Sequence, residues 1–172
     1  MTRQKTEVEA KAKAEMETKL NSGSCNCTGL RKATRRISQL YDQALAPSGM
    51  KITQRAILAQ INRSKSTNVG LLADALVMDA GALAHTLKPL ERGGLIAVEV
   101  NPDDRRHRLI SLTELGRAKL AETNALWAQA EKNFESAFGR TEAQSLRTLV
   151  QFLISDDFAA GFEKSITVSA PK

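Results

Sequence analysis

Apolar and polar positions follow a helical period over most of this chain, and the period of a strand only between residues 95 and 112. In the first clear helical stretch, residues 30–45, apolar side chains recur every three or four positions and form one stripe. Pro47 and Gly49 follow directly, and both residue types end helices. The sequence therefore predicts an amphipathic helix that ends before Pro47.

Two short helices are expected next. Thr53 is a good N-cap for a helix that reaches about Asn62, and Ser66 or Thr67 is a good N-cap for a helix that ends near Leu76. A turn of two residues then separates this helix from a fourth one. The spacing is typical of two helices packed across a tight turn.

The fourth helix is predicted to begin after Asp79, because an aspartate side chain can accept hydrogen bonds from the N–H groups of a helix start. Three leucines follow at spacings of four and three residues, so they share one face. Gly93 and Gly94 are expected to end the helix. Pro89 lies inside the pattern, where it either bends the helix or marks an earlier end.

A short hairpin is predicted after the fourth helix. Residues 95–100 are apolar and rich in β-branched side chains, and residues 108–112 mostly alternate between polar and apolar. The connection between them consists of turn-forming residues and carries the adjacent arginines Arg105 and Arg106. Helix, turn, helix and hairpin in this order predict a winged helix-turn-helix, a shape that enters the grooves of DNA.

The C-terminal part is predicted to be helical and rich in apolar surface. Thr113 opens a long helix with small and aromatic residues, which Gly139 and Arg140 interrupt. Thr141 and Gln144 then have the spacing of a capping box for a last helix. So much apolar surface on extended helices needs a partner, and we expect a second copy of the chain to supply it.

These elements predict a mainly α fold with a small β wing, in which a winged helix-turn-helix adjoins an N- and C-terminal helical dimerisation region. We expect a flexible or helical tail over residues 1–24, a main domain over 25–160 and a C-terminal tail over 161–172. Within the main domain, the DNA-binding part is expected over about 51–112, and the dimerisation helices over about 28–46 and 113–158.

The charge of the chain favours a polyanionic partner. The formal net charge is +6 and the pI is about 9.5. Between residues 30 and 63, seven cationic side chains face one acid, Asp42. The chain has two histidines and no nucleophile elbow, phosphate loop or carboxylate cluster, which argues against an enzyme. An architectural DNA-binding protein with little sequence preference is the alternative to a protein that binds specific DNA sequences.

Composition also bears on location and cofactors. No apolar run approaches the roughly twenty residues of a membrane span, and the charged N-terminus lacks the apolar core of a signal peptide. We therefore expect a cytoplasmic protein without membrane contact. Cys25 and Cys27 do not make a disulfide framework and cannot close a four-ligand zinc site, so we expect neither a metal nor another cofactor.

Four sequence elements together resemble the MarR family of bacterial transcription regulators. They are Ile52-Thr53-Gln54 followed by Ile57-Leu58, Leu72-Ala73-Asp74-Ala75-Leu76, Asp104-Arg105-Arg106, and Leu112-Thr113-Glu114-Leu115-Gly116. One Asp-Arg-Arg would be a weak signal, whereas four elements in the family's order are specific. The resemblance covers roughly residues 30–153. It implies a homodimer, acting as a repressor, that binds a pseudo-palindromic operator on double-stranded DNA through two recognition helices and two wings.

The resemblance also implies which residues contact DNA. It places Arg106 in the minor groove, with Asp104 holding its guanidinium extended; the alternative is an ordinary solvated ion pair. Ala82, Ala84 and His85 stand where relatives often carry Thr, Thr and Arg. Alanine can touch a thymine methyl group, and His85 either bonds a base or is a plain surface residue. The expected DNA contacts are Ser66, Thr67, Ala80, Ala82, Ala84, His85, Thr86, Lys88, Arg105, Arg106 and Arg108.

Two kinds of effector are compatible with the resemblance. A thiol near a helix start tends to have a lowered pKa and to be oxidisable, so Cys25 and Cys27 are either redox sensors or incidental thiols. The early cysteine and the string at residues 79–83 are similar to the organic-hydroperoxide-sensing branch of the family, although most of that branch's tyrosines are missing. An aromatic acid could instead bind a cleft, for which the candidates are Arg35, Tyr41, Ile57 and Trp127; such residues equally serve as core.

Overall fold

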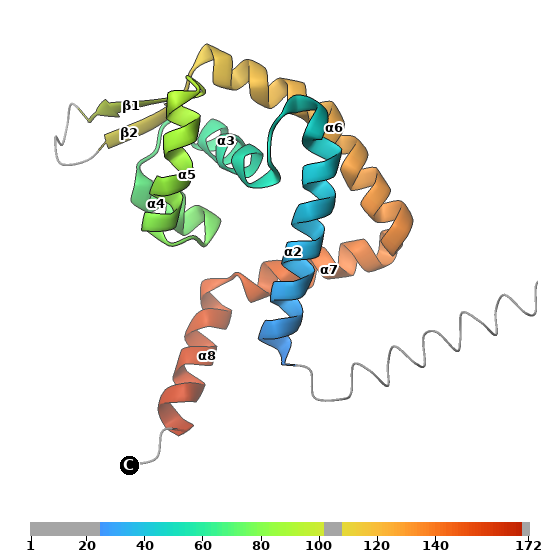
Figure 1. Ribbon diagram of the computed structural model, residues 1–172. Helices are drawn as coiled ribbons and strands as arrows, with labels where there is room; N and C mark the ends of the chain where they lie inside the picture. Colours follow the sequence, from blue (N-terminus) through green and yellow to red (C-terminus); the bar gives the residue numbers. More distant parts are fainter. Residues whose placement is uncertain (1–24, 102–107, 170–172) are drawn as a thin grey trace, which may run out of the picture. The chain divides into compact units, whose positions relative to one another are not determined.

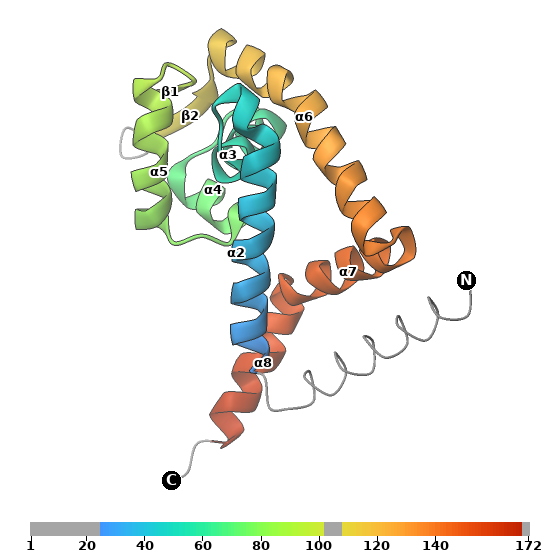
Figure 2. The ribbon, with the colours of Figure 1, turned by 45° about the vertical axis from the view of Figure 1, so that its right-hand side comes forward.

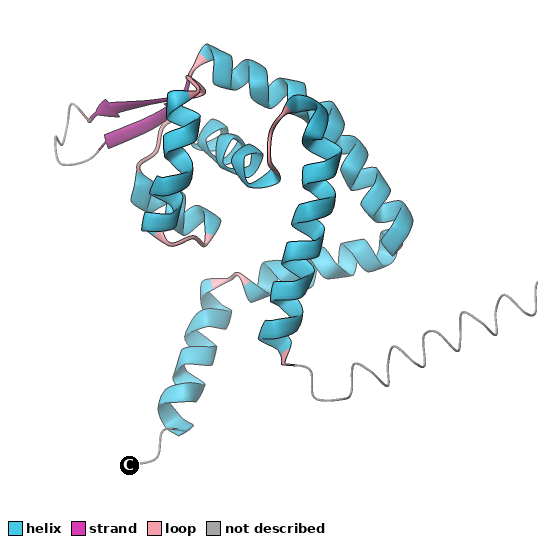
Figure 3. Ribbon diagram, in the orientation of Figure 1, coloured by secondary structure: helices cyan, strands magenta, loops and turns pink. Residues whose placement is uncertain are grey.

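The computed structural model describes residues 25–101 and 108–169, and these form seven α-helices, one 3-10 helix and a two-stranded sheet (Figures 1 and 3). The predicted mainly α fold with a small β wing is thereby confirmed. The chain divides after Leu40 into two compact units, which are described separately below. The elements are α2 (Asn26–Leu45), η1 (Ala46–Ser48), α3 (Ile52–Ser64), α4 (Val69–Leu76), α5 (Ala80–Arg92), β1 (Ile96–Val100), β2 (Arg108–Leu112), α6 (Glu114–Phe138), α7 (Arg140–Leu153) and α8 (Asp156–Ser169).

A winged lobe occupies the middle of the chain. Strands β1 and β2 pair antiparallel with Val98 opposite Ile110. Thr67 adds a bridge to the other edge of β2, because its N–H donates to the Ile110 carbonyl over 3.1 Å and its carbonyl accepts the Ile110 N–H over 2.7 Å. The segment before α4 is therefore attached to the hairpin by backbone bonds.

One apolar core holds this lobe together. It draws buried side chains from α3, α4, α5, both strands and the start of α6, and the three leucines predicted to share one face of the fourth helix all lie in it. The core residues are Met50, Ile57, Leu58, Ile61, Leu72, Ala73, Leu83, Leu87, Leu90, Ile96, Ile110, Leu112 and Leu120. Their burial fixes which face of α5 remains exposed.

Three predicted helix starts are wrong. Helix α3 begins at Ile52, so Thr53 lies inside its first turn. Helix α4 is capped by Asn68, whose side chain accepts the Leu71 N–H over 3.0 Å, because Thr67 is engaged in the bridge to β2. The capping box expected ahead of the last predicted helix does not form, since α7 already begins at Arg140.

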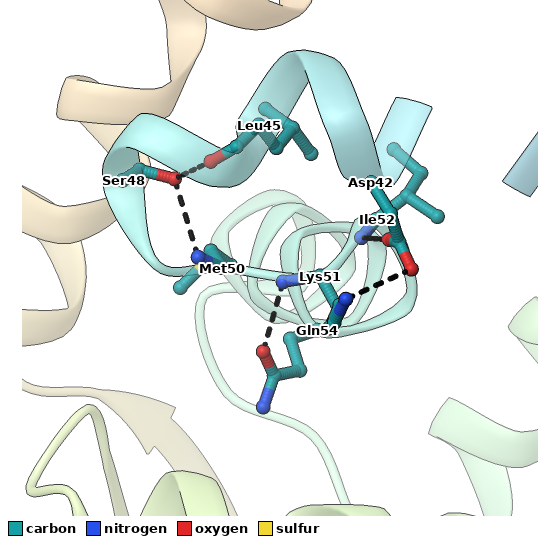
Figure 4. Close-up of polar contacts among 7 residues, drawn as sticks. All are labelled: Asp42, Leu45, Ser48, Met50, Lys51, Ile52 and Gln54. Atoms are coloured by element: carbon teal, nitrogen blue, oxygen red, sulfur yellow. Dashed lines mark hydrogen bonds and ion pairs between the residues drawn. The ribbon is translucent and has the colours of Figure 1, made fainter. Parts of the chain in front are cut away.

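A residue from α2 and a residue of α3 itself together cap the start of α3 (Figure 4). The Asp42 carboxylate accepts the Ile52 N–H over 2.7 Å and pairs with the Lys51 ammonium at 3.5 Å. The Gln54 side chain accepts the Lys51 N–H over 3.0 Å. The buried Ser48 hydroxyl donates to the carbonyl of Leu45, the last residue of α2, and accepts the N–H of Met50. The one acid of the basic stretch thus has a structural role.

The C-terminal helices lead away from the winged lobe and then turn back. Helix α6 extends from the end of the hairpin, and α7 reverses direction at Gly139, whose φ is +98° (Figure 2). Helix α8 was not predicted, and it crosses the expected domain boundary at residue 160. Phe158 packs between Phe152 and Phe162, with ring centroids 5.4 and 6.1 Å apart, which joins α7 to α8.

The length and the apolar composition of the helices decide whether any of them could cross a membrane. Within residues 25–101 and 108–169, no single helix is long and apolar enough to cross a membrane. Helices α4 and α5 pass that test only as a pair, which is bent by 108°.

The first turn of α6 lies against the backbone that connects α5 to β1. Thr113 caps α6 by accepting the Gly116 N–H over 2.9 Å, and its hydroxyl donates to the Gly94 carbonyl over 2.6 Å. A Cβ placed on Gly116 would overlap the Leu95 carbonyl oxygen and lie 2.9 Å from its carbonyl carbon. Position 116 therefore has no room for any side chain.

We expect Gly116→Ala to lower the free energy of unfolding by about 1 to 3 kcal/mol, because the added methyl group forces α6 away from Leu95. Gly161→Ala is the matched control, since a Cβ there meets nothing within 4 Å and alanine favours a helix. Urea denaturation of both variants measures the difference. Equal stability of the Gly116→Ala and wild-type proteins would contradict the close approach.

Candidate nucleic-acid interface

Helix α5 has one buried face and one exposed face. Its leucines point into the core, while Gly81, His85, Lys88 and Arg92 are exposed. These four residues are spaced four, three and four apart, so they lie along one line on the side opposite the leucines. The core therefore presents this line to solvent.

The start and course of α5 are set by local interactions. Asp79 accepts the Ala82 N–H over 2.9 Å, which confirms the predicted cap. Val77, in the turn before α5, has left-handed backbone angles (φ +51°) and is 70% exposed. Helix α5 continues through Pro89 to Arg92, so the alternative of an earlier end at the proline is wrong. The predicted helix end at Gly93 is correct.

The first two turns of α5 carry mostly small side chains. Ala80 and Ala82 are exposed, and Ala84 is half-buried. The hydroxyl of Thr86 donates to the Ala82 carbonyl over 3.0 Å, so its proton is already used within the helix. Among residues 80–86, His85 is then the exposed side chain that can donate to a base edge.

The predicted wing contacts are described only in part. Arg108 is exposed and lies opposite Val100, at the end of the hairpin next to the connecting turn. Asp104, Arg105 and Arg106 lie outside the described residues, so their roles remain predictions.

The two candidates ahead of α4 differ in exposure. Ser66 is exposed, whereas Thr67 is only 5% exposed and is occupied by its bridge to β2. We therefore leave Thr67 out of the interface.

The predicted effector residues differ in burial. Ile57 is fully buried in the apolar core of the winged lobe, so it serves as a core residue and does not line a cleft for an effector. Arg35 is exposed and belongs to the unit that ends at Leu40. Trp127 is half-buried, and the guanidinium of Arg55 lies 4.4 Å from its ring centre.

Arg55 is a polar residue that the sequence analysis counted only as charge. It is buried, donates to the Asn124 side chain over 3.0 Å, and its Nε has no partner among the described residues. Burial lowers the pKa of its guanidinium, although the nearby Glu131 carboxylate acts in the opposite direction. Arg55 precedes the core residue Leu58 by three positions, so the two residues lie on neighbouring parts of the same helix face. This spacing is the sequence signal that could have placed Arg55 at the edge of the buried face.

Tyr41 belongs to a network of charged side chains. Its hydroxyl donates to the Glu131 carboxylate over 2.7 Å, and Arg147 lies 3.7 Å from Glu131 and 2.6 Å from Glu135. Burial and the Glu131 carboxylate both disfavour a phenolate, so the pKa of Tyr41 is raised well above its usual value. This network joins the end of α2 to α6 and α7.

Both cysteines are exposed at the start of α2. Cys25 immediately precedes the helix and Cys27 lies in its first turn, as expected. Hydrogen bonds from the backbone N–H and the hydroxyl of Thr28 lower the pKa of the Cys25 thiol. A lowered pKa increases the thiolate fraction, which is the form that peroxides oxidise.

Comparison with known proteins supports this description of the winged lobe. The model of the MarR family matches residues 50–107. The chain is 25% identical over 101 residues to YvnA, an uncharacterised HTH-type transcriptional regulator of Bacillus subtilis, and 28% identical over 137 residues to the HTH-type transcriptional regulator Hpr of Geobacillus thermodenitrificans. These matches cover 59% and 75% of this chain. They span 64% of YvnA, less than two thirds of its length, and 68% of Hpr.

A solved structure extends the similarity beyond the winged lobe. The transcriptional regulator MosR of Mycobacterium tuberculosis, crystallised in complex with DNA, superposes with a TM-score of 0.71 and is 30% identical. The superposition covers 80% of this chain and 98% of MosR. The chain is 30% identical to MosR, covers 98% of it and has the same fold. These findings show that the chain belongs to the MarR family.

Proposed function

We propose that the chain is a DNA-binding transcription regulator, a homodimeric repressor that leaves a pseudo-palindromic operator in response to a small-molecule or oxidant signal. The observation that carries this proposal is the exposed line on α5, which ends in Lys88 and Arg92 and is presented by the winged core. A helix of this kind fits the major groove, and cations on the same line can pair with phosphates. The DNA complex of MosR supports the same use of the lobe.

The relatives are named as regulators, and we propose regulation rather than catalysis for this chain as well. Because its partner is DNA, we place the protein in the cytoplasm, where the DNA of its bacterial relatives lies. Selection of bound fragments from genomic DNA would supply the operator. Affinity for that operator and for scrambled DNA at matched salt then tests the proposal, because an architectural protein shows little preference between them.

The apolar surface of the C-terminal helices supports the dimer. Leu149 is 61% exposed and Phe152 is 57% exposed on α7, and Phe162 and Ile166 are exposed on α8. A contiguous apolar surface of this kind usually marks a contact with another protein. A second copy of the chain offers the same helices, and two linked winged lobes match the two halves of a pseudo-palindrome.

The wing prediction concerns Arg106. We expect Arg106→Ala to weaken operator binding by about 1 to 3 kcal/mol, with the loss concentrated on operators with A·T-rich flanks, because a narrow minor groove attracts arginine. Fluorescence anisotropy with A·T-rich and G·C-rich flanks measures it. Lys132→Ala removes one exposed charge from α6 and serves as the control. Unchanged affinity for both flanks would exclude the wing from the mechanism.

The dimer prediction concerns α7. We expect the double variant Leu149→Glu/Phe152→Glu to raise the dimer dissociation constant at least about a hundredfold, because burial of two large apolar side chains per protomer is lost. Sedimentation analysis measures the assembly, and operator affinity should fall with it because the half-sites are no longer bound together. Gln151→Glu, at an exposed polar position of the same helix, is the control. A dimeric double variant would place the interface elsewhere.

The oxidant prediction concerns Cys25 and Cys27. Hydrogen peroxide would take two electrons and two protons from two thiols, forming one disulfide and water; we expect the bridge between subunits, since residues only two apart form a strained ring. Mild peroxide should lower operator affinity at least about tenfold, and dithiothreitol should restore it. The double variant Cys25→Ser/Cys27→Ser should bind DNA and ignore peroxide. An equal response of both proteins would make the thiols bystanders and favour a small-molecule effector.

A further inference from the structure

The exposed face of α5 has an unusual composition for a helix that reads DNA. Over its first two turns, the exposed or half-buried side chains are Ala80, Ala82, Ala84, His85 and Thr86, with Gly81 between them. Three of these residues carry only a methyl group. Direct readout by hydrogen bonds uses long polar side chains, and only His85 offers one here.

Two polar side chains at the start of this face, Asp79 and Thr86, are already engaged within the helix. The Thr86 hydroxyl donates to the Ala82 carbonyl, and the Asp79 carboxylate accepts the Ala82 N–H. A Cβ on Gly81 would lie 3.1 Å from the Asp79 carboxylate, so the turn is compact at this point. Small residues and a compact turn let the helix backbone come close to the floor of a groove.

The major groove offers one apolar group to such a surface. The C5 methyl group of thymine is the feature of the base edges that has no hydrogen-bonding capacity and that favours contact with alanine. Lys88 and Arg92, which lie on one line with Gly81 and His85 further along the helix, can pair with phosphates. The cations would then hold the helix in the groove while its methyl groups select the bases.

We propose that α5 recognises its operator chiefly by contact of Ala82 and Ala84 with thymine methyl groups, with His85 supplying a single hydrogen bond to a base edge. This inference rests on the proposed function, because it assigns the kind of base that the same helix reads. It also distinguishes the chain from an architectural protein. Methyl contacts discriminate thymine from the other bases without a row of polar side chains.

The test replaces thymine by deoxyuridine, one symmetric pair of operator positions at a time. Deoxyuridine keeps the base pair and its hydrogen-bonding groups and removes only the methyl group. We expect at least one pair of positions at which the substitution lowers affinity about fourfold per methyl group, or about sixteenfold for the pair. Fluorescence anisotropy at fixed salt measures each operator.

Protein variants identify the contacting side chain. Ala82→Gly and Ala84→Gly remove the methyl groups of the protein, so the cost of deoxyuridine should disappear at the position that each residue contacts. Ala121→Gly, at an exposed position of α6, is the matched control and should keep the full cost. Thermal melting of each variant verifies that the fold is intact.

Each outcome decides one question. If the protein prefers its operator over scrambled DNA but deoxyuridine costs nothing at any position, the methyl contacts are refuted and the regulator remains. If the cost persists in both glycine variants, the assignment to Ala82 and Ala84 is wrong. If there is no preference over scrambled DNA, the proposed function itself fails.

Discussion

The close packing of Gly116 against Leu95 determines how the winged lobe continues into the long helix α6. No side chain fits between the two backbones, and Thr113 fastens the same junction by capping α6 and bonding to Gly94. Helix α6 therefore starts at a fixed point beside the end of α5. Further along α6, Leu120 lies in the core of the lobe and Asn124 accepts a hydrogen bond from Arg55 of α3.

The second half of α6 is held by polar and charged contacts as well as by packing of buried residues such as Ala130. Glu131 accepts the Tyr41 hydroxyl, Arg147 pairs with Glu135, and Arg55 lies on Trp127. These contacts connect α2, α3, α6 and α7 through polar groups, which rearrange at lower cost than a packed core does.

The two faces of α5 support the proposal that a helix poor in polar side chains reads a specific operator. Its leucines fix the orientation of the helix in the lobe, and Lys88 and Arg92 favour a polyanion. In the proposed complex, orientation and charge place the helix on DNA, and the first two turns distinguish one base from another. Methyl groups can do so wherever thymine lies beneath them.

The local sequence was enough to predict the cap at Asp79, the glycine end of α5, both strands and the burial of three leucines, because each depends on neighbours within a few residues. It failed at α3, α4 and α7, where the helix starts depend on distant groups or on a backbone turn. Asp42 caps α3 from another helix, and Thr67 is occupied by β2. The burial of Arg55 and Ile57 was likewise decided by packing. Local hydrogen bonds and periodicity can be read along a chain, whereas the partners of Asp42, Thr67 and Arg55 exist only after distant segments have come together.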